Sequence, residues 1–352
     1  MRPRRTARRG SRRAALGLAL AGAAWPAAAD QFDTLNVNVG ATVLFDDNVF
    51  RLSSGADPNR LIGSPTKADT ITVTTAGLRL SKPVSLQRFE LGLNLVDYRY
   101  DRFKFLSFTA RNYDAAWRWS LTPRFSGSLS ADRNQALSSF ADFTGFVRNL
   151  RTVETQRLTG SYEIDGVWRL VGGASRTETA NSQVFIADFD NRLSNVEGGL
   201  RYQAPSGSFA QLVARAGSGD FFKRPAPLAA GLLDTKFRQN ELEGRLRWQA
   251  TGKSSVNARL AWLERSHENF AQRDYSGWVG SLDADWGLTG KTSIAAGVRR
   301  DLASFQLASS SFTRAHRLYV GPTWEVSAKA VARARLEVST RDFLGAVANT
   351  PQ

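Results

Sequence analysis

The side chains best able to do chemistry in this sequence are arginines that recur at every second position. Arg245 and Arg247 alternate with Leu246 and Trp248, and Glu243 shares their polar face. Arginine forks pair with carboxylates and hydroxyl arrays, so such a face could line a channel for an anionic or hydroxyl-rich solute. A plain hydrated wall is the simpler interpretation. The candidates on this face are Arg245, Arg247, Arg259, Arg299, Arg317, Arg333, Arg335 and Glu243.

Catalytic chemistry has few residues available. The chain has no cysteine and two histidines, His267 and His316, which excludes thiol chemistry, disulfides and Cys/His zinc sites. A hydrolase would need one of these histidines beside a serine or a carboxylate in the folded loops. No G-x-S-x-G motif is present. We therefore expect no enzyme activity and no catalytic, cofactor or metal site.

Nearly half of the formal net charge of +15 lies at the N-terminus. Seven of the 47 basic residues fall within residues 2–13, ahead of an apolar stretch from Ala14 to Trp25 and the small residues Ala27–Ala29. This arrangement predicts a secretory signal peptide at residues 1–29. Arg12 and Arg13 also resemble a twin-arginine signal, although export of an unfolded chain fits better. Cleavage after Ala29 removes those seven basic residues, so we expect no nucleic-acid partner.

The elements that must position the arginines are short segments with a period of two. Between Leu35 and Phe45 the odd positions are mostly apolar and most of the positions between them are polar, and the pattern returns at residues 88–95, 241–248 and 278–286. Such alternation is typical of half-exposed β-strands. The mean hydropathy is −0.31, and no apolar run near 18 residues follows the first thirty positions, which excludes a helical membrane protein.

The connections between these segments alternate between short turns and long loops. Seven short turns, such as the one at Gly252, alternate with eight long loops, such as residues 46–68. This organisation predicts an all-β, transmembrane, antiparallel outer-membrane β-barrel over residues 30–352 of a Gram-negative bacterial protein. Fifteen strands can be identified. Because bacterial single-chain barrels have even strand numbers, we expect sixteen in a complete barrel and a final strand missing here.

Tryptophans provide an independent indication. Four of them lie a few residues before a short turn, one lies just after a turn, and all five share the parity of the apolar face. These residues are Trp119, Trp168, Trp248, Trp286 and Trp324. A barrel has aromatic belts where its lipid-facing surface meets the membrane interfaces. Random placement in a soluble β-sandwich is the alternative.

Two segments resemble a known family. The first strand runs into Asp46–Leu52 (DDNVFRL), and Ser339–Gly345 (STRDFLG) comes near the C-terminus. With the signal peptide and the evenly spaced hairpins, they make the chain similar to the EpsL-type outer-membrane β-barrels of exopolysaccharide-biosynthesis operons. The D-D-N-x-F-R segment is the most specific element of this resemblance.

The resemblance implies a role in moving newly made exopolysaccharide, including acidic polymers, across the outer membrane, as a channel or an accessory. It also implies contact with outer-membrane lipid and lipopolysaccharide, and with periplasmic export or chain-length proteins. The first alternative is a general diffusion porin or a structural barrel, which would be distinguished by loops that fold inward and constrict the lumen. The second alternative is the outer-membrane hydrolase considered above.

Overall fold

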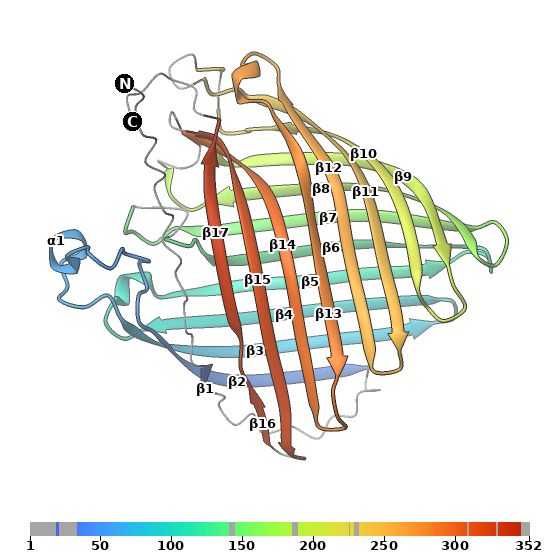
Figure 1. The fold of residues 1–352 in the computed structure, drawn as a ribbon, viewed down its shortest axis with the longest axis horizontal. Helices are drawn as coiled ribbons and strands as arrows, with labels where there is room; N and C mark the ends of the chain where they lie inside the picture. The colour runs from blue at the N-terminus through green and yellow to red at the C-terminus, as the bar shows by residue number, and fades with distance from the viewer. Residues whose placement is uncertain are drawn as a thin grey trace, which may run out of the picture.

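The computed structural model describes residues 19–20, 34–140, 145–184, 189–224, 226–228, 232–307, 310–328 and 330–345. Most of these residues lie in β-strands (Figure 1). The expected signal peptide lies outside the described residues except for Ala19–Leu20, and so does its cleavage position at Ala29. Among the residues that the structure describes, no helix is long and apolar enough to cross a membrane.

The strands follow one another along the chain with only short helical interruptions. They are β1 (Ala19–Leu20), β2 (Leu35–Asp46), β3 (Asp69–Val84), β4 (Gln87–Tyr100), β5 (Phe108–Ser120), β6 (Phe125–Leu137), β7 (Leu150–Glu163), β8 (Trp168–Asn181), β9 (Asn191–Gln203), β10 (Phe209–Asp220), β11 (Lys236–Thr251), β12 (Ser254–His267), β13 (Tyr275–Gly287), β14 (Thr292–Leu307), β15 (Ser310–Ser327), β16 (Ala330–Arg333) and β17 (Leu336–Leu344). The helical turns are α1 (Pro58–Ile62), η1 (Lys104–Leu106) and η3 (Ala271–Arg273).

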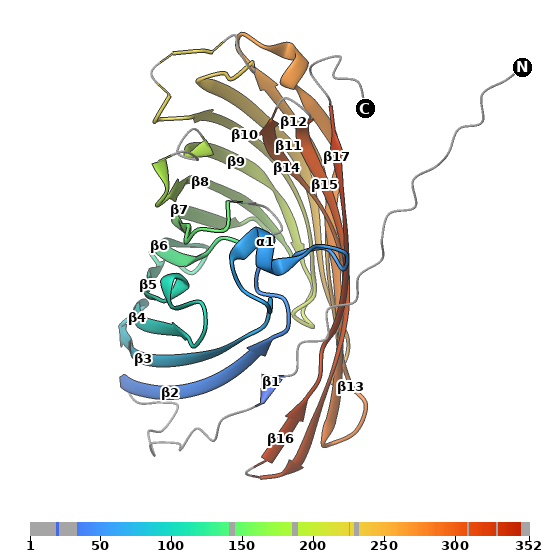
Figure 2. The ribbon, with the colours of Figure 1, turned by 90° about the vertical axis from the view of Figure 1, so that its left-hand side faces the viewer.

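Each strand from β2 to β14 pairs antiparallel with the next strand in the chain, and β15 pairs with both β16 and β17. These last two strands are one strand with an interruption, so the fifteen strands identified in the sequence are all present. The sheet curls around a central space, with α1 at the end where the long loops lie (Figure 2). The predicted all-β antiparallel barrel is confirmed.

The interruption between β16 and β17 has a local cause on the neighbouring strand. The pairing of β15 stops at Thr323 opposite Arg333 and resumes at Val320 opposite Leu336. Pro322 lies between these two pairs and has no N–H to donate to the ladder. Its carbonyl still accepts a hydrogen bond of 3.1 Å from the N–H of Ala334. One proline therefore divides the final strand in two.

The outer face of the sheet is apolar. On β11, Leu242, Leu246 and Trp248 face outward and are 42–53% exposed, while Glu241 and Glu243, on either side of Leu242, are buried on the inner face. Soluble monomers rarely expose large contiguous apolar surfaces, whereas barrels present an apolar band to lipid. The chain is an outer-membrane β-barrel with a polar interior.

The five tryptophans expected at one interface lie on this outer face close to the short turns. They are Trp119, Trp168, Trp248, Trp286 and Trp324. The last four are 40–53% exposed. Trp119 is half-buried over Gly127, with its ring 5.0 Å from that of Phe125. The rings of Trp262 and Trp278 lie 5.3 Å apart near the long loops. Aromatic side chains therefore lie at both ends of the apolar band.

The orientation of the barrel can be tested by labelling, because the native chain has no cysteine. We expect the long loops to face the cell exterior and the short turns to face the periplasm. Gly145→Cys, in the long β6–β7 loop, should react with an impermeant thiol reagent on intact cells. Gly252→Cys, in the short β11–β12 turn with open space around its Cβ position, should react only after lysis. The opposite labelling pattern would show that the orientation is wrong.

Candidate functional site

Pairing between strands aligns inward-facing arginines in one row across the wall. Arg245 lies directly opposite Arg259, and Arg299 lies directly opposite Arg317. The complete row, in order of pairing from β8 to β15, is Arg169, Arg201, Gln211, Arg245, Arg259, Ser281, Arg299 and Arg317. We call its six arginines the arginine row. Like charges directly opposed in a sheet are unfavourable unless they are compensated.

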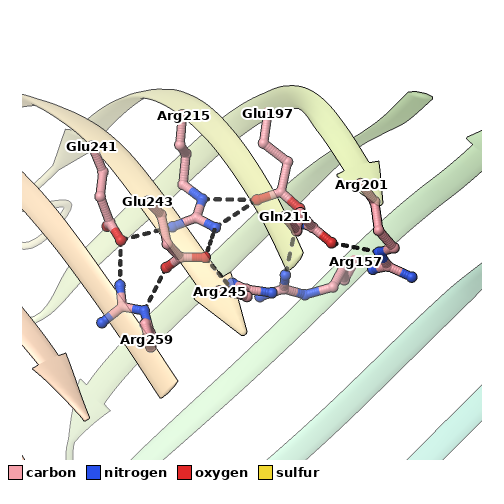
Figure 3. A network of polar contacts seen from close by, with 9 residues as sticks. All are labelled: Arg157, Glu197, Arg201, Gln211, Arg215, Glu241, Glu243, Arg245 and Arg259. Atoms are coloured by element: carbon pink, nitrogen blue, oxygen red, sulfur yellow. Dashed lines mark hydrogen bonds and ion pairs between the residues drawn. The ribbon is translucent and has the colours of Figure 1, made fainter. Parts of the chain in front are cut away.

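Glu243 supplies this compensation at the centre of the row. Its carboxylate contacts both Arg245 and Arg259, and its side chain is fully buried (Figure 3). Arg259 also contacts Glu241, which is 3.2 Å from Arg215. The two opposed arginines therefore share the Glu243 carboxylate. Both glutamates lie on the same face of β11 as Arg245 because they are two and four residues away from it.

A second carboxylate extends this network toward β7. Glu197 accepts hydrogen bonds of 2.8 Å and 2.7 Å from Arg215 and lies 3.8 Å from Arg157 (Figure 3). Arg201 donates a 2.7 Å hydrogen bond to the neutral side-chain oxygen of Gln211. Arg201 is the arginine of the network whose hydrogen-bond partner is a neutral amide rather than a carboxylate.

A recess of about 510 Å³ opens beside this network on the inner wall. It is lined by four guanidinium groups, two other long polar side chains and four hydroxyls, from Arg118, Arg157, Arg201, Arg245, Glu197, Gln211, Ser126, Ser128, Thr159 and Ser161. We call this site the basic recess. Four arginines against one lining carboxylate give it a positive balance, although Arg118 is also paired with Glu90 at 2.9 Å and Arg245 with Glu243. These groups can bind carboxylates and sugar hydroxyls.

The structure corrects one hypothesis about the wall. The alternation of residues suggested one basic stretch of wall formed by Arg245, Arg247, Arg259, Arg333 and Arg335, with Glu243 neutralising part of the Arg245–Arg259 pair. Glu243 does contact both of these arginines. Arg333 and Arg335, however, follow β15, and strands β13–β15 separate them from β12. Parity along a strand identifies the face of a side chain but does not show which strands lie beside it.

The remaining sequence candidates lie on the inner face away from the recess. Arg317 and Arg335 both contact Glu337, at 3.1 Å and 3.0 Å. The guanidinium of Arg335 also lies 4.1 Å from the ring centroid of Tyr319. Arg299 continues the arginine row. Arg247 and Arg333 are opposite Asn257 and Thr323, closer to the short turns.

Six residues of the network were not among the sequence candidates: Arg157, Glu197, Arg201, Gln211, Arg215 and Glu241. Two of them, Arg157 and Arg215, lie on β7 and β10. Their strands alternate less clearly, because Val213 on β10 faces inward and is 2% exposed. An apolar residue on the polar face removes the period-two contrast that identifies a strand's orientation. The alternation of Arg157 with Leu158 was the one available signal.

The D-D-N-x-F-R segment forms a compact turn at the mouth of the barrel. Arg51 pairs with both oxygens of Asp46, at 2.8 Å and 2.7 Å, and has a left-handed backbone with φ of 54°. The side-chain amide of Asn48 donates a hydrogen bond to the backbone carbonyl of Leu52 and accepts one from the backbone N–H of Leu52, both at 2.9 Å. This turn inserts Phe50, which is 1% exposed, into an apolar cluster.

That cluster places the β2–β3 loop against the inner wall. The ring of Phe50 lies 4.8 Å from Phe103 and 4.7 Å from Phe140, both in neighbouring long loops. Val73 on β3 and Val96 on β4 belong to the same cluster and face inward. The first long loop is therefore folded inward at the mouth.

Neighbouring long loops are also joined by polar contacts. Lys223 lies 2.6 Å from Asp190, which connects the β10–β11 loop to the β8–β9 loop. Asp234 accepts hydrogen bonds of 2.5 Å and 3.0 Å from Asn269 of the β12–β13 loop. Burial acts to raise the pKa of Asp234, but these bonds and two from backbone N–H groups hold that pKa below its ordinary value. These contacts join neighbouring long loops into a connected rim at the mouth of the barrel.

Neither histidine lies in an open reactive site. Nδ1 of His267 lies 3.2 Å from Asp274, and the His267 side chain is 1% exposed. Asp274 also accepts the backbone N–H of His267 at 2.7 Å, so the pair closes the β12–β13 loop. His316 lies on the outward face between Arg300 and Thr340. Within the described ranges, no cluster of three or more His, Asp or Glu residues could hold a metal ion.

No family model and no curated protein matches this chain. The solved structures that resemble it include the siderophore receptor PirA from Pseudomonas aeruginosa, with 12% identity and a TM-score of 0.41 over 88% of this chain and 56% of that one. A mutant of the ferric enterobactin receptor PfeA from the same organism has 12% identity and a TM-score of 0.40, covering 78% and 51%. The alcaligin outer-membrane receptor FauA from Bordetella pertussis has 13% identity and a TM-score of 0.38, covering 86% and 57%. The chain spans about half the length of these structures.

Proposed function

We propose that this outer-membrane barrel is a channel for an anionic or densely hydroxylated glycan, and that it acts in exopolysaccharide export. The observation that supports this proposal best is the basic recess on the inner wall. Its guanidinium groups can bind uronate carboxylates, and its serine and threonine hydroxyls can exchange hydrogen bonds with sugar hydroxyls. The resemblance of the D-D-N-x-F-R and STRDFLG segments to EpsL-type barrels supports the same cargo.

The pairing of arginines with carboxylates in the wall favours passage of a polymer over its tight retention. Most arginines of the network already share a carboxylate, so each contact with a passing polymer replaces an existing interaction. Conduction requires sites that bind strongly enough to attract the solute and weakly enough to release it. Arg201, whose partner is the neutral Gln211, is the arginine most available to an incoming carboxylate.

The proposal predicts that Arg157→Gln with Arg201→Gln weakens block of single-channel current by an oligouronate roughly tenfold. One lost charge-assisted contact of this kind corresponds to about that factor. The barrel should remain folded, because Glu197 keeps Arg215 as its partner. Anion selectivity and polymer release from cells should fall together.

Arg333→Gln is the matched control, since it removes an inward arginine outside the basic recess. We expect it to leave block by the oligouronate close to the wild-type value. Equal block by wild-type protein and the double variant, in a folded barrel, would contradict a role of the basic recess in binding the glycan.

One observation favours a general diffusion porin as the second candidate. The β2–β3 loop folds inward at the mouth, which is the feature expected of a constricted diffusion channel. A diffusion porin would pass small neutral sugars at the same rate in wild-type protein and in the double variant, and deleting its gene would leave polymer release unchanged. An export channel requires the opposite result for polymer release.

A further inference from the structure

A groove of about 670 Å³ crosses the outer wall on the opposite side of the sheet from the arginine row. Two adjacent outward rows supply most of its lining. The lower row is Leu129, Leu158, Ala174, Val196, Ala216 and Asn240, and the upper row is Gln156, Arg176, Ser194, Ser218 and Arg238. Large side chains lie at the ends of these rows and mostly small ones lie between them. The groove is therefore a depression over β9 and β10.

The upper row places two arginines on either side of this depression. Arg176 and Arg238 are separated by Ser194 and Ser218, which is three strand spacings, or about 14 Å. Both arginines are exposed. Across the described part of the chain, no carboxylate pairs with either of them within the 4.0 Å of an ion pair.

The next outward row, closer to the long loops, is different. There Arg192 lies 3.0 Å from Glu178 and 3.8 Å from Asp220, so its charge is neutralised by its neighbours. The charge of Arg176 and Arg238 is therefore not a general property of this surface. The positive charge is concentrated where the wall is hollowed.

The height of the groove corresponds to a membrane interface. Leu242 is opposite Trp262, which pairs with Trp278 in the upper aromatic belt. Arg238 lies four residues beyond Leu242 toward the long loops, or about 13 Å along the strand. Aromatic belts mark the level of lipid headgroups, so the upper row lies at or just beyond that level. The apolar end of the groove, at Leu129 and Leu158, continues into the lipid-facing band.

From these positions we infer that the groove binds a phosphorylated glycolipid of the outer leaflet, the lipid A part of lipopolysaccharide. Arg176 and Arg238 bind its phosphates, since arginine forks bind phosphate in two-point contacts. Ser194 and Ser218 bind sugar hydroxyls between them, and an acyl chain lies over Leu158. This inference concerns the outer face and is independent of what passes through the lumen.

The test uses full-length barrel in nanodiscs, with purified lipid A as the probe and bound lipid measured by native mass spectrometry. Arg176→Gln with Arg238→Gln should weaken lipid A binding roughly 30-fold, from the loss of two arginine contacts at a membrane surface. Ala216→Phe keeps both arginines but fills the depression, and it should weaken binding as well. Arg111→Gln, which removes an exposed outward arginine outside the groove, should bind lipid A like wild type.

Three results would overturn the inference. Unchanged lipid A binding by the double arginine variant would show that Arg176 and Arg238 do not bind the phosphates. Loss of binding in that variant with full binding by Ala216→Phe would indicate attraction by surface charge without a groove. Equal competition by phosphatidylglycerol would mean that any anionic headgroup is accepted. Heat modifiability on gels confirms that each variant is folded.

Discussion

Leu93→Arg should lower the free energy of unfolding by about 2–4 kcal/mol, the cost of an arginine near mid-membrane on a lipid-facing strand. Leu93 lies at mid-strand on β4, is 45% exposed on the outer face, and is opposite Leu78 and Tyr113. The neighbouring Asn94→Arg is the matched control, because Asn94 faces the lumen opposite Asn112. We expect that variant to lie within about 1 kcal/mol of wild type.

Both variants should be compared by urea unfolding in lipid bilayers. The difference between them tests the assignment of the two faces directly, since the substitutions differ by one position along the same strand. Equal destabilisation by the two arginines would mean that this part of β4 does not separate a lipid face from a water-filled face.

Glu243→Gln should lower the free energy of unfolding by about 2–3 kcal/mol. The carboxylate is fully buried and contacts two opposed arginines, Arg245 and Arg259, which would lose their shared counter-charge. Removing one partner from a buried ion pair can cost more than this, but the two arginine side chains are 37% and 33% exposed, so water screens part of the loss.

A second substitution tests whether charge is the cause. Glu243→Gln with Arg245→Gln removes both members of one pair, while Arg259 keeps Glu241, so we expect part of the lost stability to return. Glu163→Gln, which breaks the more exposed pair with Arg169, should cost less than about 1 kcal/mol. Failure of the double variant to regain any stability would show that Glu243 acts through packing.

Much of the fold follows from local pattern. The alternation along β11 identified its inner and outer faces, because successive side chains on a strand point in opposite directions. A tight hairpin determines its own register, so a tight turn at Gly252 is enough to predict that Arg245 lies opposite Arg259, and the structure has this pair. The division of the last strand could not be derived in this way, because it depends on Pro322 of the neighbouring strand.

What the sequence by itself determined is the class of protein, the face on which most strands present their arginines, and the pairing of Arg245 with Arg259 within one tight hairpin. The tertiary structure alone decided which arginines of different hairpins meet. The arginine row, the basic recess shared by Arg118 and Arg201, and the groove between Arg176 and Arg238 each combine strands from different hairpins. The physical reason is that side-chain parity is a property of one strand and hairpin register is a property of two. A site on a barrel wall depends on the registers of several successive strand pairs, including pairs joined by long loops whose length does not specify a register.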